Sequence, residues 1–176
     1  MEYRIIRSRR KTISLQIQPN GEVLVRCPNR MRVQDIRRFV ESKADWIQTH
    51  LPKEPLLPAF TEAELRTLAD RAKAQIPPKV QHFAPLVGVN FGRITIRSQH
   101  TRWGSCSAKG NLNFNCLLML TPPEILDYVV VHELCHRKEL NHSPRCWAEV
   151  ERVLPDYRVS RKWLKENGSQ LIARLP

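Results

Sequence analysis

The sequence predicts a single α+β domain, in which a β-rich N-terminal lobe (residues 1–51) precedes a part (61–176) where a helix packs on a small sheet. Stretches that alternate apolar and polar residues, as strands do, occur in both parts. Apolar residues at helical spacing follow the strands of the first part, and Thr-x-x-Glu capping boxes open helices in the second. A chain of 176 residues is long enough for one domain with a substantial core.

The N-terminal lobe is expected to contain three strands and one helix. The strands are expected at residues 3–7, 13–18 and 22–27, and the turn "PNG" at 19–21 joins the last two. From Val33 to Leu51 apolar residues recur at helical spacing, which predicts the helix. Residues 52–60 contain three prolines in nine positions, so we expect a linker or an extended crossing there.

The second part is expected to open with a helix. Thr61 and Glu64 form a capping box at its start, and the two prolines after Ile76 are expected to end it. Two strands are then expected at residues 93–98 and 101–106.

A second capping box, T-P-P-E, predicts the next helix. Thr121 is expected to cap it, with Pro122 at the first helical position and Glu124 at the third. The tail from Ser160 is expected to form a short helix that stops at Gly168.

Charge and cysteine content limit the class of protein. Five cysteines without a CxxC pair argue for a reducing compartment and against a disulfide framework. No stretch approaches the ~18 consecutive apolar residues of a membrane span, and the first residues lack the apolar region of a signal peptide. We therefore expect a cytoplasmic protein that does not associate with membranes. The 29 basic and 17 acidic residues give a formal charge of +12. This charge fits either a solvated surface or a polyanionic partner, such as nucleic acid, a nucleotide or an acidic peptide.

The motif "HELCH" at residues 132–136 is the main candidate for chemistry. On a strand, His132 and His136 would lie about 13 Å apart, too far to bind one ion. On a helix the same spacing brings their Cβ atoms to about 5–6 Å, so that both imidazoles can reach one zinc ion at about 2.0–2.1 Å. The proline-led start of this segment favours the helix. Glu133 is rotated by about 100° from His132, which suits a general base better than a ligand.

A third ligand is expected at His142. A catalytic zinc site usually has three protein ligands and one open position. His142 would lie about 80° off the ligand face if the helix continued, so the chain must turn back. Asn141 tolerates a left-handed backbone, and Ser143 followed by Pro144 is typical of the cap and first residue of a new helix. A closed structural site with Cys135 as fourth ligand is the alternative, although Cys135 is expected to point away from the two helical histidines.

The segments around this motif resemble a known family. "TRWGSCSAKGNLNFN" (101–115), "TPPEILDYVVVHELCHRKELNHSPRCW" (121–147) and "PDYRVSRKWLKENG" (155–168) are similar to the YgjP-like metal-dependent hydrolases, which are related to SprT-like and WLM zinc peptidases. The resemblance extends to the N-terminal lobe and covers nearly the whole chain. It implies a zincin-like fold in which one Zn²⁺ ion is bound by His132, His136 and His142, with Glu133 as the base.

Three further residues are candidates for contact with a substrate. Arg102 and Trp103 belong to "RWGSC", which is expected to border the cleft, where Arg102 would meet a carboxylate or a phosphate. The alternative is that Trp103 packs against the active helix and Gly104 permits the close approach. Tyr157 is a candidate hydrogen-bond donor to an oxyanion, with simple packing as its alternative.

These residues lead us to expect a zinc-dependent metallopeptidase. Zn²⁺ would lower the pKa of its bound water toward about 7, Glu133 would accept the proton, and the peptide bond would be hydrolysed. Two alternatives remain open: a metal-dependent pyrophosphatase of nucleoside triphosphates such as UTP, which the resemblance and the charge suggest, and a basic nucleic-acid-binding protein with a structural zinc. The sequence does not choose among a peptide, a nucleotide and a nucleic acid, and it sets no oligomeric state.

Overall fold

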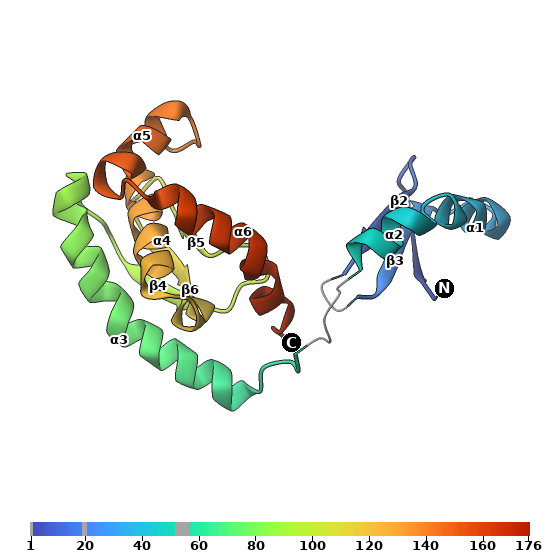
Figure 1. Cartoon of the computed structure of the whole chain (residues 1–176), viewed down its shortest axis with the longest axis horizontal. Helices are drawn as coiled ribbons and strands as arrows, with labels where there is room; N and C mark the ends of the chain where they lie inside the picture. The colour runs from blue at the N-terminus through green and yellow to red at the C-terminus, as the bar shows by residue number, and fades with distance from the viewer. Residues whose placement is uncertain (1, 19–20, 52–56) are drawn as a thin grey trace. The chain divides into compact units, whose positions relative to one another are not determined.

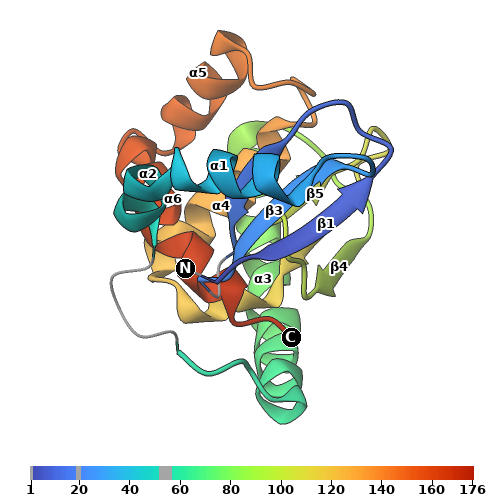
Figure 2. The same cartoon turned by 90° about the vertical axis from the view of Figure 1, so that its right-hand side faces the viewer.

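The computed structural model divides the chain into two compact units, Met1–Pro58 and Ala59–Pro176 (Figures 1 and 2). It describes residues 2–18, 21–51 and 57–176. The boundary lies in the predicted linker 52–60, of which residues 52–56 are outside the described residues. That the two units form a single domain stays a prediction.

The described residues of the N-terminal unit form a three-stranded sheet and two helices. Its elements are β1 (Arg4–Ser8), β2 (Ser14–Ile17), β3 (Val23–Pro28), α1 (Val33–Glu41) and α2 (Ala44–His50). The strand order is β1-β3-β2, with β1 parallel and β2 antiparallel to β3. The three predicted strands are confirmed, while residues 19 and 20 of the predicted turn lie outside the described residues. The core consists of apolar side chains from the central strand and both helices: Val23, Val25, Cys27, Ile36, Val40 and Ile47.

The single helix predicted from Val33 to Leu51 is wrong, because the chain breaks between α1 and α2. The Ser42 hydroxyl donates to the carbonyl of Phe39 at 2.7 Å, a local bond that competes with the helical hydrogen-bond ladder. Apolar side chains of both helices still reach the same core. Their spacing therefore continues across the break and gives no sign of it in the sequence.

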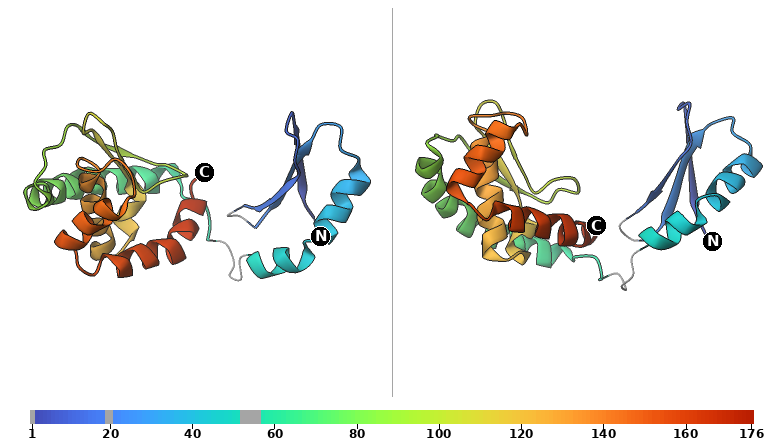
Figure 3. Two further views of the ribbon diagram at one scale, coloured as in Figure 1. Left: turned by 90° about the horizontal axis from the view of Figure 1, so that it is seen from above. Right: turned by 45° about the horizontal axis from the view of Figure 1, so that its top comes forward.

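The C-terminal unit contains four helices, a 3-10 turn and a second small sheet (Figure 3). Its elements are α3 (Glu62–Val87), β4 (Ile94–Arg97), β5 (Gly104–Cys106), β6 (Leu112–Asn115), η1 (Cys116–Leu120), α4 (Pro123–Cys135), α5 (Pro144–Val153) and α6 (Tyr157–Ala173). The strand order is β4-β6-β5, with β4 parallel and β5 antiparallel to β6. The expected mixture of helices and small sheets is confirmed, and two of its strands lie within the predicted ranges 93–98 and 101–106.

Helix α4 lies at the centre of this unit. It packs against α3, α5, α6 and β5, and Figure 1 shows it between α3 and α6. Because neighbours surround it, α4 is apolar on almost all sides instead of along one stripe. Its buried residues are Ile125, Leu126, Tyr128, Val129, Val130, Val131, Glu133, Leu134 and Cys135. Among the described residues, no helix combines the length and the apolar character that a membrane span requires.

Helix α3 is longer than the sequence predicts. The capping box between Thr61 and Glu64 is confirmed at its start. The predicted end at Ile76 is wrong, because the helix continues through two consecutive prolines and ends at Gly88, whose φ of 79° is a left-handed conformation that glycine adopts without steric cost. Beyond the prolines, the buried apolar residues keep their helical spacing, and the helix as a whole packs on η1 and α4. Its buried residues are Leu68, Ala72, Ile76, Val80, Phe83, Ala84 and Val87.

The predicted cap of α4 is also wrong. The Thr121 hydroxyl donates to the Leu118 carbonyl at 2.9 Å, at the end of η1, and does not cap α4. The N-cap is Pro122, which makes no side-chain cap hydrogen bond, while Glu124 lies in the first turn as expected.

Helix α6 does not stop at Gly168, as the sequence predicts, but continues to Ala173. Gly168 is buried inside the helix, and a Cβ atom added there would lie 3.1 Å from the indole of Trp103. This glycine therefore permits the close approach of Trp103 to the helix.

Candidate metal centre

Three imidazoles converge at the C-terminal end of α4. His132 lies in the last turn of the helix, His136 is its C-cap residue, and His142 follows in the turn before α5. The Nε2 atom of His132 lies 3.1 Å from Nε2 of His142 and 3.2 Å from Nε2 of His136. One ligand atom from each residue falls within 4.8 Å of the others. The structure thus brings together the three histidines that the sequence predicts.

The spacing of these nitrogens fits a tetrahedral metal ion. With metal–nitrogen bonds of about 2.0–2.1 Å, the edge of a tetrahedron is about 3.3–3.4 Å. The two nitrogen–nitrogen distances of 3.1 and 3.2 Å are close to this edge. A carbonyl oxygen can only accept, so His136 Nδ1, which lies 2.9 Å from the Glu139 carbonyl, carries a hydrogen. The lone pair of a neutral His136 is therefore on Nε2, which faces the other two rings.

Burial and neighbouring charges favour the neutral forms of His132 and His142, and neutral imidazole is the form that binds metals. Burial, followed by the neighbouring His136 and His142, lowers the pKa of His132 to about 3. Burial, followed by His136, also lowers the pKa of His142. The Nδ1 atom of His132 is buried and has no hydrogen-bond partner among the described residues.

The turn that carries His142 is built differently from the prediction. No non-glycine residue in the described part of the chain has a positive φ, so Asn141 does not adopt the left-handed backbone that its residue type tolerates. Instead, its side-chain oxygen accepts from the Ser143 N–H at 3.1 Å. The Ser143 hydroxyl in turn accepts from the Cys146 N–H at 3.4 Å, which confirms Ser143 as the cap of α5 and Pro144 as its first residue.

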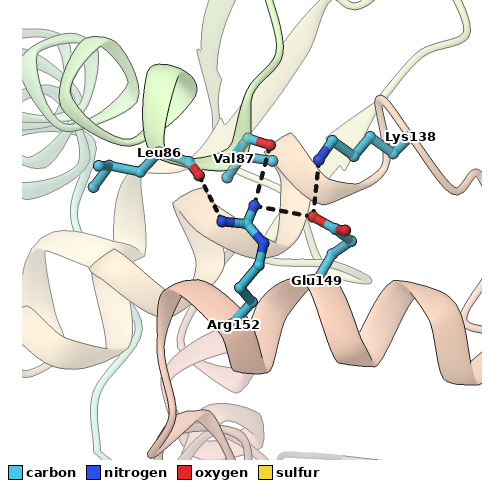
Figure 4. A network of polar contacts seen from close by, with 5 residues as sticks. All are labelled: Leu86, Val87, Lys138, Glu149 and Arg152. Carbon is cyan, nitrogen blue, oxygen red and sulfur yellow. Dashed lines mark hydrogen bonds and ion pairs between the residues drawn. The ribbon is translucent and has the colours of Figure 1, made fainter.

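A polar network holds this turn against two helices (Figure 4). Glu149 of α5 bonds to Lys138 at 2.9 Å and to Arg152 at 3.0 Å. The Arg152 guanidinium also donates to the last carbonyls of α3, those of Leu86 and Val87, at 3.0 and 3.2 Å. The network links the chain just after α4 to α5 and to the end of α3, and nothing in the sequence singles out its members.

Glu133 lies beside the cluster in a tight pocket. Only 5% of its surface is exposed. Burial, offset in part by Arg102, raises the pKa of Glu133 to about 8. A Cβ atom added to Gly104 of β5 would lie 2.6 Å from Glu133 Oε1 and 2.7 Å from its Cγ. Gly104 thus permits a close approach between β5 and α4, as the sequence suggests. The group that lies against it is the Glu133 side chain.

A cavity of about 560 Å³ opens over these residues. Arg102 and Trp103 both line it, together with His132, Glu133, His136 and His142. Tyr128 also lines the cavity, and its ring centroid lies 5.8 Å from that of His132. Burial raises the pKa of Tyr128 to about 12, so its hydroxyl stays protonated and able to donate. Tyr128 was not among the residues predicted from the sequence, although it stands four residues before His132 and therefore on the same face of the helix.

Tyr157 is not among the cavity residues. It is buried, and its ring stacks 5.7 Å from Trp147 and 6.4 Å from Tyr128, which is the packing role that the sequence left open. Cys135 is fully buried and is not part of the histidine cluster.

The sequence and fold were compared with known proteins. A family model described as "YgjP-like, metallopeptidase domain" matches residues 11–66 and 57–167. A search of curated proteins finds no match. Two solved structures are similar to part of the chain: the metallopeptidase zymogens abylysin of Pyrococcus abyssi (22% identity, TM-score 0.48) and jannalysin of Methanocaldococcus jannaschii (20% identity, TM-score 0.43). Each alignment covers 52% of this chain, with 94% of the abylysin chain and 96% of the jannalysin chain. Similarity at this level assigns neither site residues nor a reaction.

Proposed function

Because the chain belongs to the YgjP-like metallopeptidase family, a family of metal-dependent hydrolases, we propose that it hydrolyses peptide bonds with one zinc ion held by His132, His136 and His142. Glu133 is the general base. The observation that carries this proposal is the convergence of three Nε2 atoms beside a buried carboxylate.

The three imidazoles supply a set of nitrogen ligands that suits zinc, and all three line the cavity. When bound, the ion supplies a Lewis acid that polarises the scissile carbonyl and makes water more acidic. Glu133 accepts the proton of the attacking water and passes it to the leaving amine. A dication nearby would favour the ionised form of Glu133, which burial alone disfavours.

The remaining residues around the site hold this geometry. The hydrogen bond from His136 to the Glu139 carbonyl fixes the ring orientation. Gly104 leaves room for the Glu133 carboxylate. Tyr128 presents a protonated hydroxyl at the cavity wall, where it donates to the oxyanion that develops on the substrate carbonyl.

The test uses purified zinc-loaded protein and its Glu133→Gln variant, offered casein-derived peptides and a panel of nucleoside triphosphates side by side. We expect peptide cleavage by the wild type, a loss of about 10²–10⁴-fold in the variant, and unchanged zinc content. Glu124→Gln, an exposed acid on the same helix, is the matched control and should retain activity. Phosphate release without peptide cleavage would replace the proposal with nucleotide hydrolysis. Zinc binding with no turnover of either class, together with salt-sensitive retention on DNA, would instead support the binding protein.

A further inference from the structure

One arginine lines the cavity, and a second lies outside its lining, on another element. Arg102 lines the cavity just before β5, and its charge acts on Glu133. Arg161 lies on α6, one turn before Leu164, which also lines the cavity. The guanidinium carbon of Arg161 lies 4.3 Å from the ring centroid of Trp147.

Trp147 brings Arg161 close to the metal ligands. Its ring centroid lies 5.3 Å from that of His132 and 5.6 Å from that of His142. Stacking on an indole holds the guanidinium plane in place, which reduces the entropy lost when the group binds a ligand.

Neither arginine has an acidic partner within the part of the chain that the structure describes. Several other cations of this unit do have one: Lys79 pairs with Asp127, Lys138 and Arg152 with Glu149, and Arg158 with Glu151. Glu133 is the only carboxylate among the described residues that line the cavity. Arg102 at the cavity wall and Arg161 beside the histidine cluster are therefore available to an acidic group of a substrate, because the one carboxylate of the cavity is assigned to the chemistry.

We propose that Arg102 and Arg161 make the cleft selective for peptides that carry a carboxylate beside the scissile bond, either an acidic side chain or the C-terminal group. This inference rests on the proposed peptidase function. Guanidinium groups bind carboxylates through paired, charge-assisted hydrogen bonds, and an arginine held in position does so at lower entropic cost. A neutral side chain at the same place would leave both charges without a partner.

Arg161→Gln is the diagnostic variant, because it removes the charge without touching Glu133. Two matched peptide pairs are compared: an internal Glu against Gln, and a free C terminus against its amide. We expect kcat/KM of the variant to fall about tenfold, corresponding to about 1.4 kcal/mol, on the carboxylate peptides and to stay unchanged on the neutral ones. The loss should appear in KM, because the carboxylate is bound equally before and during the reaction. The peptide pair between which the variant no longer discriminates shows whether the recognised carboxylate is an acidic side chain or the C-terminal group.

Arg158→Gln is the matched control. Arg158 lies one turn earlier on the same helix, is exposed, and pairs with Glu151 at 2.8 Å, so its loss should not change the preference. Arg102→Gln is expected to lower turnover of all peptides, because Arg102 also acts on Glu133. Equal losses on carboxylate and neutral peptides in Arg161→Gln, or wild-type protein without a preference, would overturn the proposal.

A binding measurement separates this proposal from the peptidase function itself. Zinc-loaded Glu133→Gln protein, with and without Arg161→Gln, is titrated into the same labelled peptides and followed by fluorescence anisotropy. Tighter binding of the carboxylate peptides that disappears with Arg161→Gln supports the selectivity even when turnover is absent. Equal affinity for both members of each pair refutes the selectivity even when peptides are cleaved.

Discussion

Glu133 is a carboxyl group that burial keeps protonated until a metal ion is near. Its pKa in the metal-free protein is about 8, against an ordinary value of 4.5. Between pH 4.5 and about 8, Glu133 is protonated in the folded state and ionised in the unfolded state. The free energy of unfolding of the metal-free protein therefore falls as the pH rises through this window, and Glu133 destabilises the fold most at its alkaline end.

We predict that Glu133→Gln stabilises the metal-free protein at pH 8. His132 changes its protonation below its ordinary pKa of 6.5, so the window from pH 6.5 to about 8 isolates the glutamate. One pKa unit corresponds to about 1.4 kcal/mol, so the wild type should lose about 2 kcal/mol across this window while the variant does not. Urea denaturation in the presence of a chelator measures the free energy of unfolding of the wild type and of the variant across this window. Parallel pH profiles would contradict the assignment of a buried, protonated Glu133.

Gly104 also sets the geometry of the site, because its lack of a side chain leaves room for Glu133. Its Cβ position is occupied by Glu133, whose Oε1 and Cγ atoms would lie 2.6 and 2.7 Å away. Real Cβ atoms do not come this close to their neighbours, so any side chain at this position displaces the glutamate.

We predict that Gly104→Ala lowers kcat by about 10²-fold, in the range expected when a general base is misplaced. The zinc content should remain at one ion per chain, because the three histidines come from other elements. Elemental analysis and steady-state kinetics on the same preparation check both parts. Full activity in this variant would show that the position of Glu133 against β5 is not required.

Helix α3 shows how packing overrides a local signal. Proline in a helix interior removes one hydrogen bond and crowds the preceding turn, at a cost of about 3 kcal/mol. Two consecutive prolines are therefore a strong end signal in the sequence. The helix nevertheless continues, because Val80, Phe83 and Val87 beyond the prolines are buried against the rest of the unit. The burial of several large apolar side chains outweighs the loss, since each contributes roughly 1.5–3 kcal/mol.

We predict that Pro78→Ala raises the free energy of unfolding by about 1–2 kcal/mol. Pro78 is exposed, so no packing is lost, and alanine restores the hydrogen bond to the Ala74 carbonyl. The greater freedom of the unfolded chain offsets part of the gain. Urea denaturation of the variant and the wild type measures the difference. An unchanged or lower stability would mean that α3 does not run through this position.

The balance between local signals and tertiary packing also explains which helix boundaries the sequence could predict. Thr61 and Ser143 cap their helices as expected, because each bonds within its own turn and needs no distant partner. Gly168 has the residue type of a helix stop, but Trp103, far away in the sequence, packs on it and makes it an interior position. Thr121 has the residue type of a cap, yet its hydroxyl bonds backward to η1. Signals that depend on tertiary neighbours are not visible in the sequence.

The same distinction between local geometry and tertiary packing applies to the residues of the candidate site. The spacing of His132 and His136 on one helix is a local property, so the sequence predicts their convergence from helix geometry alone. The sequence also predicts the turn that returns His142 and its Ser143 cap, but not the bond from the Ser143 N–H to the Asn141 side chain. Arg161 reaches the site only through the packing of Trp147 and α6, which its place in the sequence does not reveal. Tyr128, in contrast, shares the four-residue spacing of His132 and His136, so its place beside His132 follows from helix geometry.

At the scale of the whole molecule, the site belongs to one of the two compact units. Every residue of the histidine cluster and of the cavity lies within Ala59–Pro176. This unit has its own hydrophobic core, contributed by α3, α4, α5, α6, η1 and β6. A segment of this length buries enough apolar surface to fold by itself.

We predict that residues 59–176, expressed alone, unfold cooperatively and bind one zinc ion with an affinity within about tenfold of that of the full chain. The reason is that all three ligands and the network that fixes their turn come from this segment. Thermal unfolding with and without zinc measures both properties, because a bound ion raises the melting temperature by an amount that grows with the logarithm of its affinity. His142→Ala in the same segment is the control and should abolish most of the zinc-dependent shift. A segment that folds but shows no such shift would mean that Met1–Pro58 is needed to complete the metal centre, while a segment that does not unfold cooperatively would mean that the two units fold as one.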